Sequence, residues 1–396
     1  MTISKDEGLK LIEFSHRLYH EGIAVDPSIL KGIDLDNEYL EQTHLLFEWN
    51  HEFNLASKLP AGFRINDGSF NQLILDSNSQ YKIIREGETF YIAKNNEKLY
   101  PITFPKRPKF YNKLTSDGVK MSTIGQYYGD GQLFIIYSNE CALKDKGKSC
   151  LFCNINQTKD TYAEKENIKW KSAKQIAETV KAAYDEGFKH VTISGGFIPE
   201  RREVDYYIDI AEKIQEVTGL ENFNGSACIG APQDLSVIEK YKEAGYRSIA
   251  TNIEIWDENI FKTICPGKET LCGGHKHWIE ALKEEVNVFG KGNVRSTLVA
   301  GIEPKESLLE GIEYLASIGV IANASPWDPN PGSALEGHRA PTIEWFNEVN
   351  QKAYNIYKRY FTHEQFFYAN ASSYNIFDSY YDLDGDTLPW IKSSFK

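Results

Sequence analysis

The chain has 396 residues, of which 41% are hydrophobic and 25% charged, and its formal net charge is −12. This length is enough to bury a large core, and the composition is that of a soluble globular protein. The excess of acid argues against nucleic acid or an anionic membrane as a partner. The first residues resemble no secretory signal, and no apolar stretch is long enough to span a bilayer. We therefore expect a cytoplasmic protein.

Residues 1–125 predict a small N-terminal α+β extension. Apolar residues recur at roughly helical spacing from Leu9 to Leu18, and residues 38–50 predict a second helix. From Tyr81 onward, short apolar runs alternate with turn-like segments, which predicts antiparallel strands. Nothing in this extension indicates a chemical role.

Residues 126–361 alternate strand and helix signals, and a tail, residues 362–396, is expected to pack on them. A capping box at Ser172 and Gln175 predicts the start of one helix, and another follows Pro304. Short connections between alternating strands and helices are typical of parallel βα units. The fold class is therefore α/β, a partial (β/α)6 TIM-type barrel, with its functional residues at the carboxyl ends of the strands. The expected strands are 132–139, 189–194, 222–229, 247–255, 293–301 and 319–325.

Three cysteines follow the first expected strand of the barrel. Cys141, Cys150 and Cys153 have the spacing C-x8-C-x2-C. Soft thiolates suit an iron–sulfur cluster, and three of them leave one iron of a four-iron cluster open to another ligand. The alternatives are a structural zinc site or three unrelated cysteines. Zinc sites usually close with a fourth Cys or His, which the residues after Cys153 do not offer.

Polar and glycine residues stand at the ends of later strands. Gly195-Gly196 allows close approach of a ligand, although such a pair is also common in turns. Asn252 and Glu254 alternate with an isoleucine, which predicts two polar side chains on the inner face of the barrel. They would bind the hydroxyls of a ribose or form a structural hydrogen-bond network. Arg295 would pair with a carboxylate of a cofactor or substrate, or form a surface ion pair.

The last expected strand ends at a polar segment. Asn323, Ser325 and Asp328 lie where substrate contacts of a barrel belong, and they suggest a hydrophilic substrate. Each of them alone is as well explained as a capping or turn residue.

Three further cysteines leave two interpretations open. Cys228 ends the third expected strand, and Cys265 and Cys272 follow the fourth. Together they could hold an auxiliary iron–sulfur cluster, or they could be buried free thiols.

Taken in order, these motifs resemble the radical S-adenosylmethionine (radical SAM) superfamily, most closely its biotin-synthase-like branch. The match covers roughly residues 130–350 and leaves the first 125 uncovered. Most members have C-x3-C-x2-C, so the x8 spacing departs from the usual pattern. The residues that carry the resemblance are Cys141, Cys150 and Phe152-Cys153, then Ser194-Gly195-Gly196, Asn252-Ile253-Glu254, Gly301-Ile302-Glu303 and the segment Asn330-Pro331-Gly332-Ser333-Ala334-Leu335.

The resemblance implies a [4Fe-4S] cluster on the three cysteines, with S-adenosylmethionine bound to the open iron. Phe152 would lie by the adenine, Gly195 and Gly196 would meet the amino end, and Asn252 and Glu254 would bind the ribose. Ser194, Arg295 and Gly301 would complete the cofactor site, and Asn323, Ser325 and Asp328 would contact the substrate.

The reaction implied is reductive cleavage of S-adenosylmethionine, followed by hydrogen abstraction from a small polar metabolite that leads to rearrangement, C–C cleavage or transfer. The expected partners are this substrate and an electron donor such as flavodoxin or ferredoxin. The alternatives are a non-catalytic iron–sulfur or zinc scaffold, a non-radical barrel enzyme, and sulfur insertion. Sulfur insertion is less favoured, because Ser194 and the region of Ser296 stand where biotin synthase has ligands of its second cluster.

Overall fold

The structure, a computed structural model, describes residues 5–34, 38–39, 59–66, 70–127, 131–155, 170–198, 200–329, 332–362 and 365. Most of the helix predicted over residues 38–50 lies outside the described residues, as does nearly all of the tail predicted over residues 362–396. Asn330 and Pro331 of the motif at the last strand also lie outside them.

The N-terminal part contains one long helix, α1 (Lys5–Glu21), and a six-stranded sheet with the order β1-β4-β5-β6-β2-β3. As the turn-like segments predicted, the strands from Tyr81 onward pair antiparallel. The sheet has a hydrophobic core of its own, which includes Phe63, Ile83 and Ile92. The bounds are β1 (Ala24–Val25), η1 (Pro27–Leu30), β2 (Gly62–Ile65), β3 (Phe70–Gln72), β4 (Tyr81–Glu86), β5 (Thr89–Lys94) and β6 (Glu97–Thr103).

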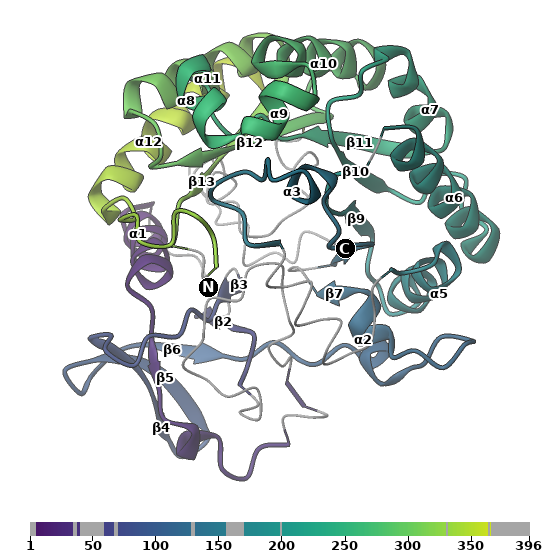
Figure 1. Ribbon diagram of the computed structural model, residues 1–396. Coiled ribbons are helices and arrows are strands. Elements are labelled where there is room, and N and C mark those ends of the chain that lie inside the picture. Colours follow the sequence, from purple (N-terminus) through teal and green to yellow (C-terminus); the bar gives the residue numbers. More distant parts are fainter. Residues whose placement is uncertain are drawn as a thin grey trace.

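A second sheet has the order β13-β12-β11-β10-β9-β8-β7. All neighbours from β8 to β13 are parallel, and β7 pairs antiparallel at the edge. The sheet curves into an arc (Figure 1), which confirms the predicted partial (β/α)6 barrel. Its strands are β7 (Gln126–Tyr127), β8 (Gln132–Ile136), β9 (His190–Ser194), β10 (Gly225–Ile229), β11 (Tyr246–Thr251), β12 (Val294–Ala300) and β13 (Val320–Pro326).

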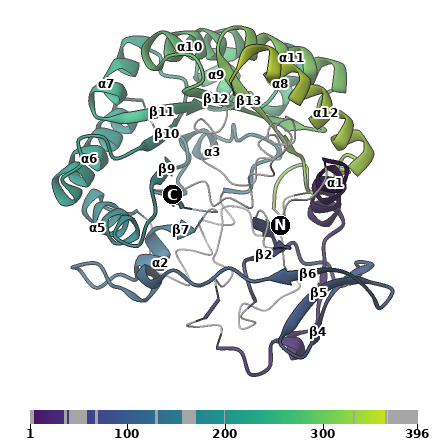
Figure 2. The same ribbon diagram turned by 180° about the vertical axis from the view of Figure 1, so that it is seen from behind.

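Helices cover the convex side of this sheet, and Figure 2 shows the same arc from behind. They are α5 (Ala173–Tyr184), α6 (Glu200–Thr218), α7 (Ile238–Glu243), α10 (Gly274–Phe289), α11 (Lys305–Ser317) and α12 (Ile343–Tyr360). The predicted capping box is present, because Ser172 and Gln175 exchange side-chain to backbone hydrogen bonds. Shorter elements complete the chain: η2 (Lys109–Asn112), α2 (Met121–Ile124), α3 (Ala142–Asp145), η3 (Leu235–Val237), α8 (Glu258–Ile264) and α9 (Pro266–Leu271).

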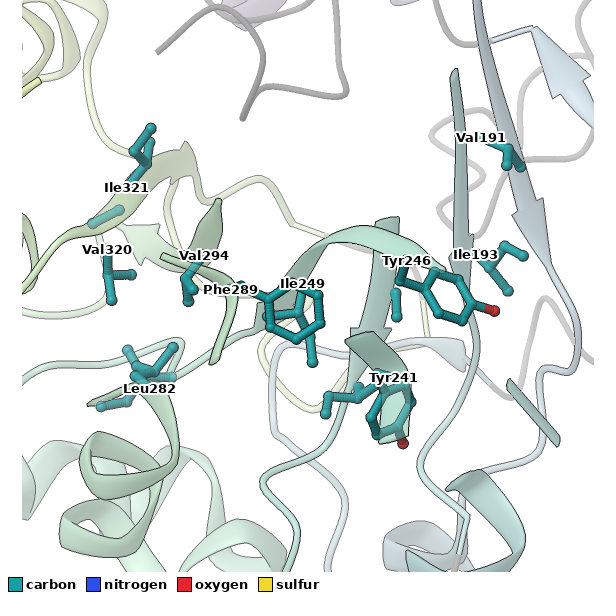
Figure 3. Packing of buried hydrophobic residues seen from close by; sticks show 14 of the residues in the cluster. Val191, Ile193, Tyr241, Tyr246, Ile249, Leu282, Phe289, Val294, Val320 and Ile321 are labelled. Carbon is teal, nitrogen blue, oxygen red and sulfur yellow. The ribbon is translucent and has the colours of Figure 1, made fainter. Parts of the chain in front are cut away.

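The main core lies between the sheet and these outer helices (Figure 3). Val191, Ile193, Ile249 and Val294 come from three strands, β9, β11 and β12, and Leu282 comes from α10; all five are fully buried. Burial of such a side chain stabilises the fold by about 1.5–3 kcal/mol. Since alternate residues of a strand point to opposite faces, the neighbours of these residues face the concave side.

The concave face of the sheet is polar. On β9 the residues that alternate with Val191 and Ile193 include His190 and Thr192, both buried. The Nε2 atom of His190 lies 3.2 Å from Oγ of Ser226 and 3.4 Å from Oγ1 of Thr192. Burial lowers the pKa of His190 to about 3, and the charges of Arg247 and Arg295 act in the same direction. The concave face at β9 is therefore polar and holds a neutral histidine that two arginines influence electrostatically.

Helix α1 joins the N-terminal part to the barrel by packing against α12. The Nδ1 atom of His16 lies 2.5 Å from Oδ1 of Asn347, and Arg17 lies 3.7 Å from the carboxylate of Glu344. The rings of His16 and His20 both contact Phe346. The two helices lie side by side in both views (Figures 1 and 2).

Candidate active site

The three cysteines lie on the loop between β8 and α5. Cys141 is the N-cap of α3, and the backbone N–H of Cys153 donates to the carbonyl of Cys150 at 3.1 Å. All three side chains are half-buried and in the free thiol form. Figure 1 shows α3 on the concave side of the curved sheet, so the loop lies over the interior of the barrel.

The three thiols interact electrostatically. Burial raises the pKa of Cys153 to about 12, and the neighbouring Cys150 and Cys141 contribute in the same direction. Within the described residues, no three or more His, Cys, Asp or Glu side chains are gathered around one metal-ion position. A single zinc ion requires its ligands around one point, whereas a four-iron cluster distributes three thiolates over three irons. Three soft thiol donors on one loop are of the kind that ligate the irons of an iron–sulfur cluster.

The end of β9 supports one side of this cysteine loop. Ala142 N–H donates to the carbonyl of Phe197 at 2.7 Å, and Gly196 N–H donates to that of Ser138 at 2.9 Å. A Cβ added to Gly196 would lie 2.0 Å from the carbonyl oxygen of Glu140. A side chain at position 196 would therefore displace the segment that leads into Cys141.

The connection between α8 and α9 supports another side. Leu151 N–H donates to the carbonyl of Ile264 at 2.9 Å. A Cβ added to Gly267 would lie 2.4 Å from the carbonyl oxygen of Lys148. The segment after β13 also contributes, because Leu335 N–H donates to the carbonyl of Leu151 at 3.2 Å. Contacts from three places in the sequence thus fix the loop.

Two buried amides adjoin the cysteines, and sequence reasoning gave neither a binding role. Asn139 is 7% exposed and Asn154 is 3% exposed, and the side-chain oxygen of each has no hydrogen-bond partner among the described residues. Because an unsatisfied buried acceptor costs free energy, such atoms fit a bound molecule that supplies N–H or O–H donors. The only signal in the sequence is their position next to the cysteines.

Asn252 and Glu254 lie beyond the end of β11, not within it. The strand ends at Thr251, and Glu254 has a left-handed φ of 69°, so the predicted alternation to residue 255 is wrong. The Oδ1 atom of Asn252 accepts from Thr297 N–H at 3.0 Å, and its Nδ2 lies 3.9 Å from Sγ of Cys228. The backbone N–H of Glu254 donates to the carbonyl of Thr297 at 2.9 Å.

Lys268 of α9, which sequence reasoning missed, binds both predicted ribose residues. Its Nζ donates to the backbone carbonyl of Asn252 at 2.7 Å and to Oε1 of Glu254 at 2.9 Å. The ammonium also lies 4.2 Å from the ring centroid of Trp278. Burial lowers the pKa of Lys268, but the charge and hydrogen bond of Glu254, together with the charges of Cys150 and Cys265, raise it above its ordinary value.

The other predicted cofactor residues lie on several elements of the barrel. Ser194 hydrogen-bonds to the thiol of Cys228, and Phe152 packs against the main core. Arg295 is half-buried on β12. Gly301 has a φ of 112°, and an added Cβ would lie 2.8 Å from Pro341, so backbone conformation and packing explain this glycine.

The predicted substrate residues share the end of β13. Asn323 is paired in register with Thr297, and Ser325 with Val299; both polar residues are half-buried. Asp328 follows the strand and is half-buried. Burial raises the pKa of Asp328 to about 7, so its carboxyl group would titrate near neutrality.

The remaining cysteines do not form a separate group. The Cys265 thiol hydrogen-bonds to that of Cys150, and the Cys272 thiol interacts electrostatically with Cys141 and Cys150. Cys228 instead contacts Asn252 and Ser194. This division disfavours an auxiliary cluster on Cys228, Cys265 and Cys272.

The chain is similar in sequence to known proteins. Residues 135–320 match the family model of the radical SAM superfamily. The chain is 31% identical over 240 residues to a bacteriochlorophyllide c C-7(1)-hydroxylase of Chlorobaculum limnaeum, covering 57% of this chain and 60% of the relative. It is 25% identical over 183 residues to a 5-amino-6-(D-ribitylamino)uracil–L-tyrosine 4-hydroxyphenyl transferase 2 of Methanosarcina barkeri (strain Fusaro / DSM 804). This match covers 41% of this chain and 43% of the relative. The chain therefore spans less than two thirds of each curated relative.

Among solved structures, the chain matches methylornithine synthase with a TM-score of 0.42, 17% identity and coverage of 61% of this chain and 68% of that one. The hydrogenase maturase HydG from Carboxydothermus hydrogenoformans gives a TM-score of 0.43, 14% identity and coverage of 60% and 56%. A search of the described helices for one long and apolar enough to cross a membrane found none.

Proposed function

We propose that this chain, a member of the radical SAM superfamily, cleaves S-adenosylmethionine reductively and then abstracts hydrogen from a small polar metabolite. Enzymes of this superfamily use a [4Fe-4S] cluster and S-adenosylmethionine. The observation that carries this proposal is the cysteine loop. Contacts from β9, the α8–α9 connection and residue 335 hold Cys141, Cys150 and Cys153 over the concave side of the barrel.

Cys141, Cys150 and Cys153 would hold the cluster. When bound and reduced, the cluster supplies the electron that splits the sulfonium of S-adenosylmethionine into methionine and a 5′-deoxyadenosyl radical. The chain's own residues bind and orient the reactants and exclude water from them. Asn139 and Asn154 would accept hydrogen bonds from donors of the bound nucleotide, since their side-chain oxygens are buried without partners.

Asn252 and Glu254 would bind the ribose hydroxyls, with Phe152, Ser194, Gly195, Gly196, Arg295 and Gly301 around the remainder of the cofactor. Asn323, Ser325 and Asp328 would contact the substrate. The polar concave face, with Arg295 close to His190, supports a hydrophilic substrate. An electron donor such as flavodoxin or ferredoxin would reduce the cluster.

The test is anaerobic reconstitution with iron and sulfide, reduction with dithionite, and chromatographic detection of 5′-deoxyadenosine. We expect the wild-type chain to form it and Cys141→Ala, Cys150→Ala and Cys153→Ala to form none. Cys272→Ala is the matched control, since it removes a buried thiol outside the proposed ligand set. Wild-type protein that takes up a cluster but forms no 5′-deoxyadenosine would overturn the proposal.

A second candidate reaction is hydroxylation of a carbon centre, favoured by the 31% identity to a relative named as a hydroxylase. It shares the hydrogen-abstraction step, after which the substrate radical would lose one electron to a redox partner protein and take up the oxygen of water with release of a proton. Mass spectrometry of the product, looking for one added oxygen atom, would distinguish it from rearrangement or cleavage. Sulfur insertion has less support, because Cys228 lies apart from the contacts of Cys265 and Cys272.

A further inference from the structure

Lys268 lies at a junction between two parts of the site that are distant in the sequence. Its neighbour Gly267 packs against the cysteine loop at the carbonyl of Lys148. Its own ammonium reaches the segment from Asn252 to Glu254. The start of α9 therefore contacts both the proposed cluster loop and the proposed ribose segment.

The contacts of Lys268 are those of a buried, fully engaged cation. The residue is 8% exposed, and the side chain of its partner Glu254 is 14% exposed. A lysine ammonium has three donors. Two of them are directed to Asn252 O and Glu254 Oε1, and the charge also lies over the ring of Trp278. Removal of one partner from such a pair leaves an uncompensated buried charge, which is strongly unfavourable.

The segment that Lys268 holds has a conformation that requires support. Glu254 is one of five described non-glycine residues with positive φ. Such a conformation costs free energy and persists only where the surroundings enforce it. Backbone hydrogen bonds to Thr297 and from Val299 fix one side of Glu254, and Lys268 fixes its carboxylate on the other.

We infer that Lys268 is a positioning residue for nucleoside binding. It acts through Glu254, holding that carboxylate and the carbonyl of Asn252 in place, while the second carboxylate oxygen of Glu254 would bind the cofactor. This inference rests on the proposed function. It predicts that loss of Lys268 weakens nucleotide binding without loss of the cluster.

The experiment measures the dissociation constant of S-adenosylhomocysteine, which is not cleaved, by calorimetry on reconstituted protein. We expect Lys268→Met to weaken binding at least tenfold, with iron content and the absorbance near 400 nm unchanged. Lys268→Gln retains a donor for the carbonyl of Asn252, so its dissociation constant should lie between those of wild type and Lys268→Met. This variant replaces Lys268→Met in the experiment if the methionine variant does not fold. Lys262→Met on α8 is the matched control, because that lysine pairs with Glu258 at the surface.

A double-mutant cycle tests whether the effect passes through Glu254. In a Glu254→Gln background, Lys268→Met should weaken binding less than threefold further, and in turnover it should raise KM more than it lowers kcat. Full additivity of the two changes, or binding by Lys268→Met equal to wild type, would overturn the inference alone. Wild-type protein that binds neither S-adenosylhomocysteine nor S-adenosylmethionine would overturn the proposed function and this inference with it.

Discussion

The hydroxyl of Thr251 donates a 2.5 Å hydrogen bond to Oε1 of Glu285, a carboxyl group with no accessible surface between β11 and α10. The other carboxyl oxygen has no hydrogen-bond partner in the described ranges of the chain. Burial raises the pKa of Glu285 to about 8 from 4.5. The folded protein therefore binds a proton there that the unfolded chain releases above pH 4.5.

This linkage predicts that the contribution of Glu285 to stability is complete below pH 4.5 and declines as the pH rises through 8. Each pKa unit corresponds to about 1.4 kcal/mol, so the decline amounts to a few kcal/mol. Glu285→Gln keeps the acceptor for Thr251 but does not ionise, and it should unfold at a higher temperature than wild type at pH 8.5. Thermal unfolding at pH 6 and 8.5 measures this, with exposed Glu280→Gln on the same helix as control. Identical pH dependence in Glu285→Gln and wild type would contradict it.

The interface between α1 and α12 should weaken in acid. Burial lowers the pKa of both His16 and His20 to about 4 from 6.5. Both are therefore neutral in the folded protein at pH 7, and their contribution to stability, present above pH 6.5, is lost as the pH falls towards 4. His20→Phe keeps a ring against Phe346 without a titratable nitrogen. Its unfolding temperature should fall less than that of wild type between pH 7 and 4.5.

The control for this experiment is His338→Gln, an exposed histidine outside both helices. It should show the same acid dependence as wild type. If His20→Phe loses as much stability in acid as wild type, the interface histidines do not control the response.

The strands were predictable because their periodicity depends on local sequence, and the prediction of the three cysteines as cluster ligands depends on a local spacing as well. Strand periodicity and the C-x8-C-x2-C spacing are visible within short windows. The environment of Glu254 was not predictable from local sequence. The strand alternation predicted through residue 255 ends at Thr251, and Glu254 has a positive φ. Lys268 looks like any helical lysine in the sequence, and only the tertiary contact with Glu254, 14 residues away, reveals its role.

A buried amide in α12 offers a route to higher stability. Asn350 is 1% exposed, and within the part of the chain that the structure describes, both polar atoms of its side chain lack hydrogen-bond partners. Each unsatisfied buried group costs about 1–3 kcal/mol. Asn350→Leu, of similar size, should raise the midpoint of thermal unfolding by several degrees. Exposed Asn355→Leu on the same helix is the control and should change it little; a lower midpoint for Asn350→Leu would show that the amide has a partner in solution.

The glycine at the end of β9 should control cluster uptake. A Cβ at position 196 would lie 2.0 Å from the carbonyl of Glu140, a backbone atom that cannot rotate away. Gly196→Ala should therefore displace Cys141 and lower the iron bound after anaerobic reconstitution by more than half, while the core of the barrel remains folded. Iron and sulfide analysis with circular dichroism measures both effects. Gly337→Ala, where nothing lies within 4 Å of the added atom, is the control. Full iron content in Gly196→Ala would mean that the loop shifts without consequence, and that close packing on β9 does not position the cysteine.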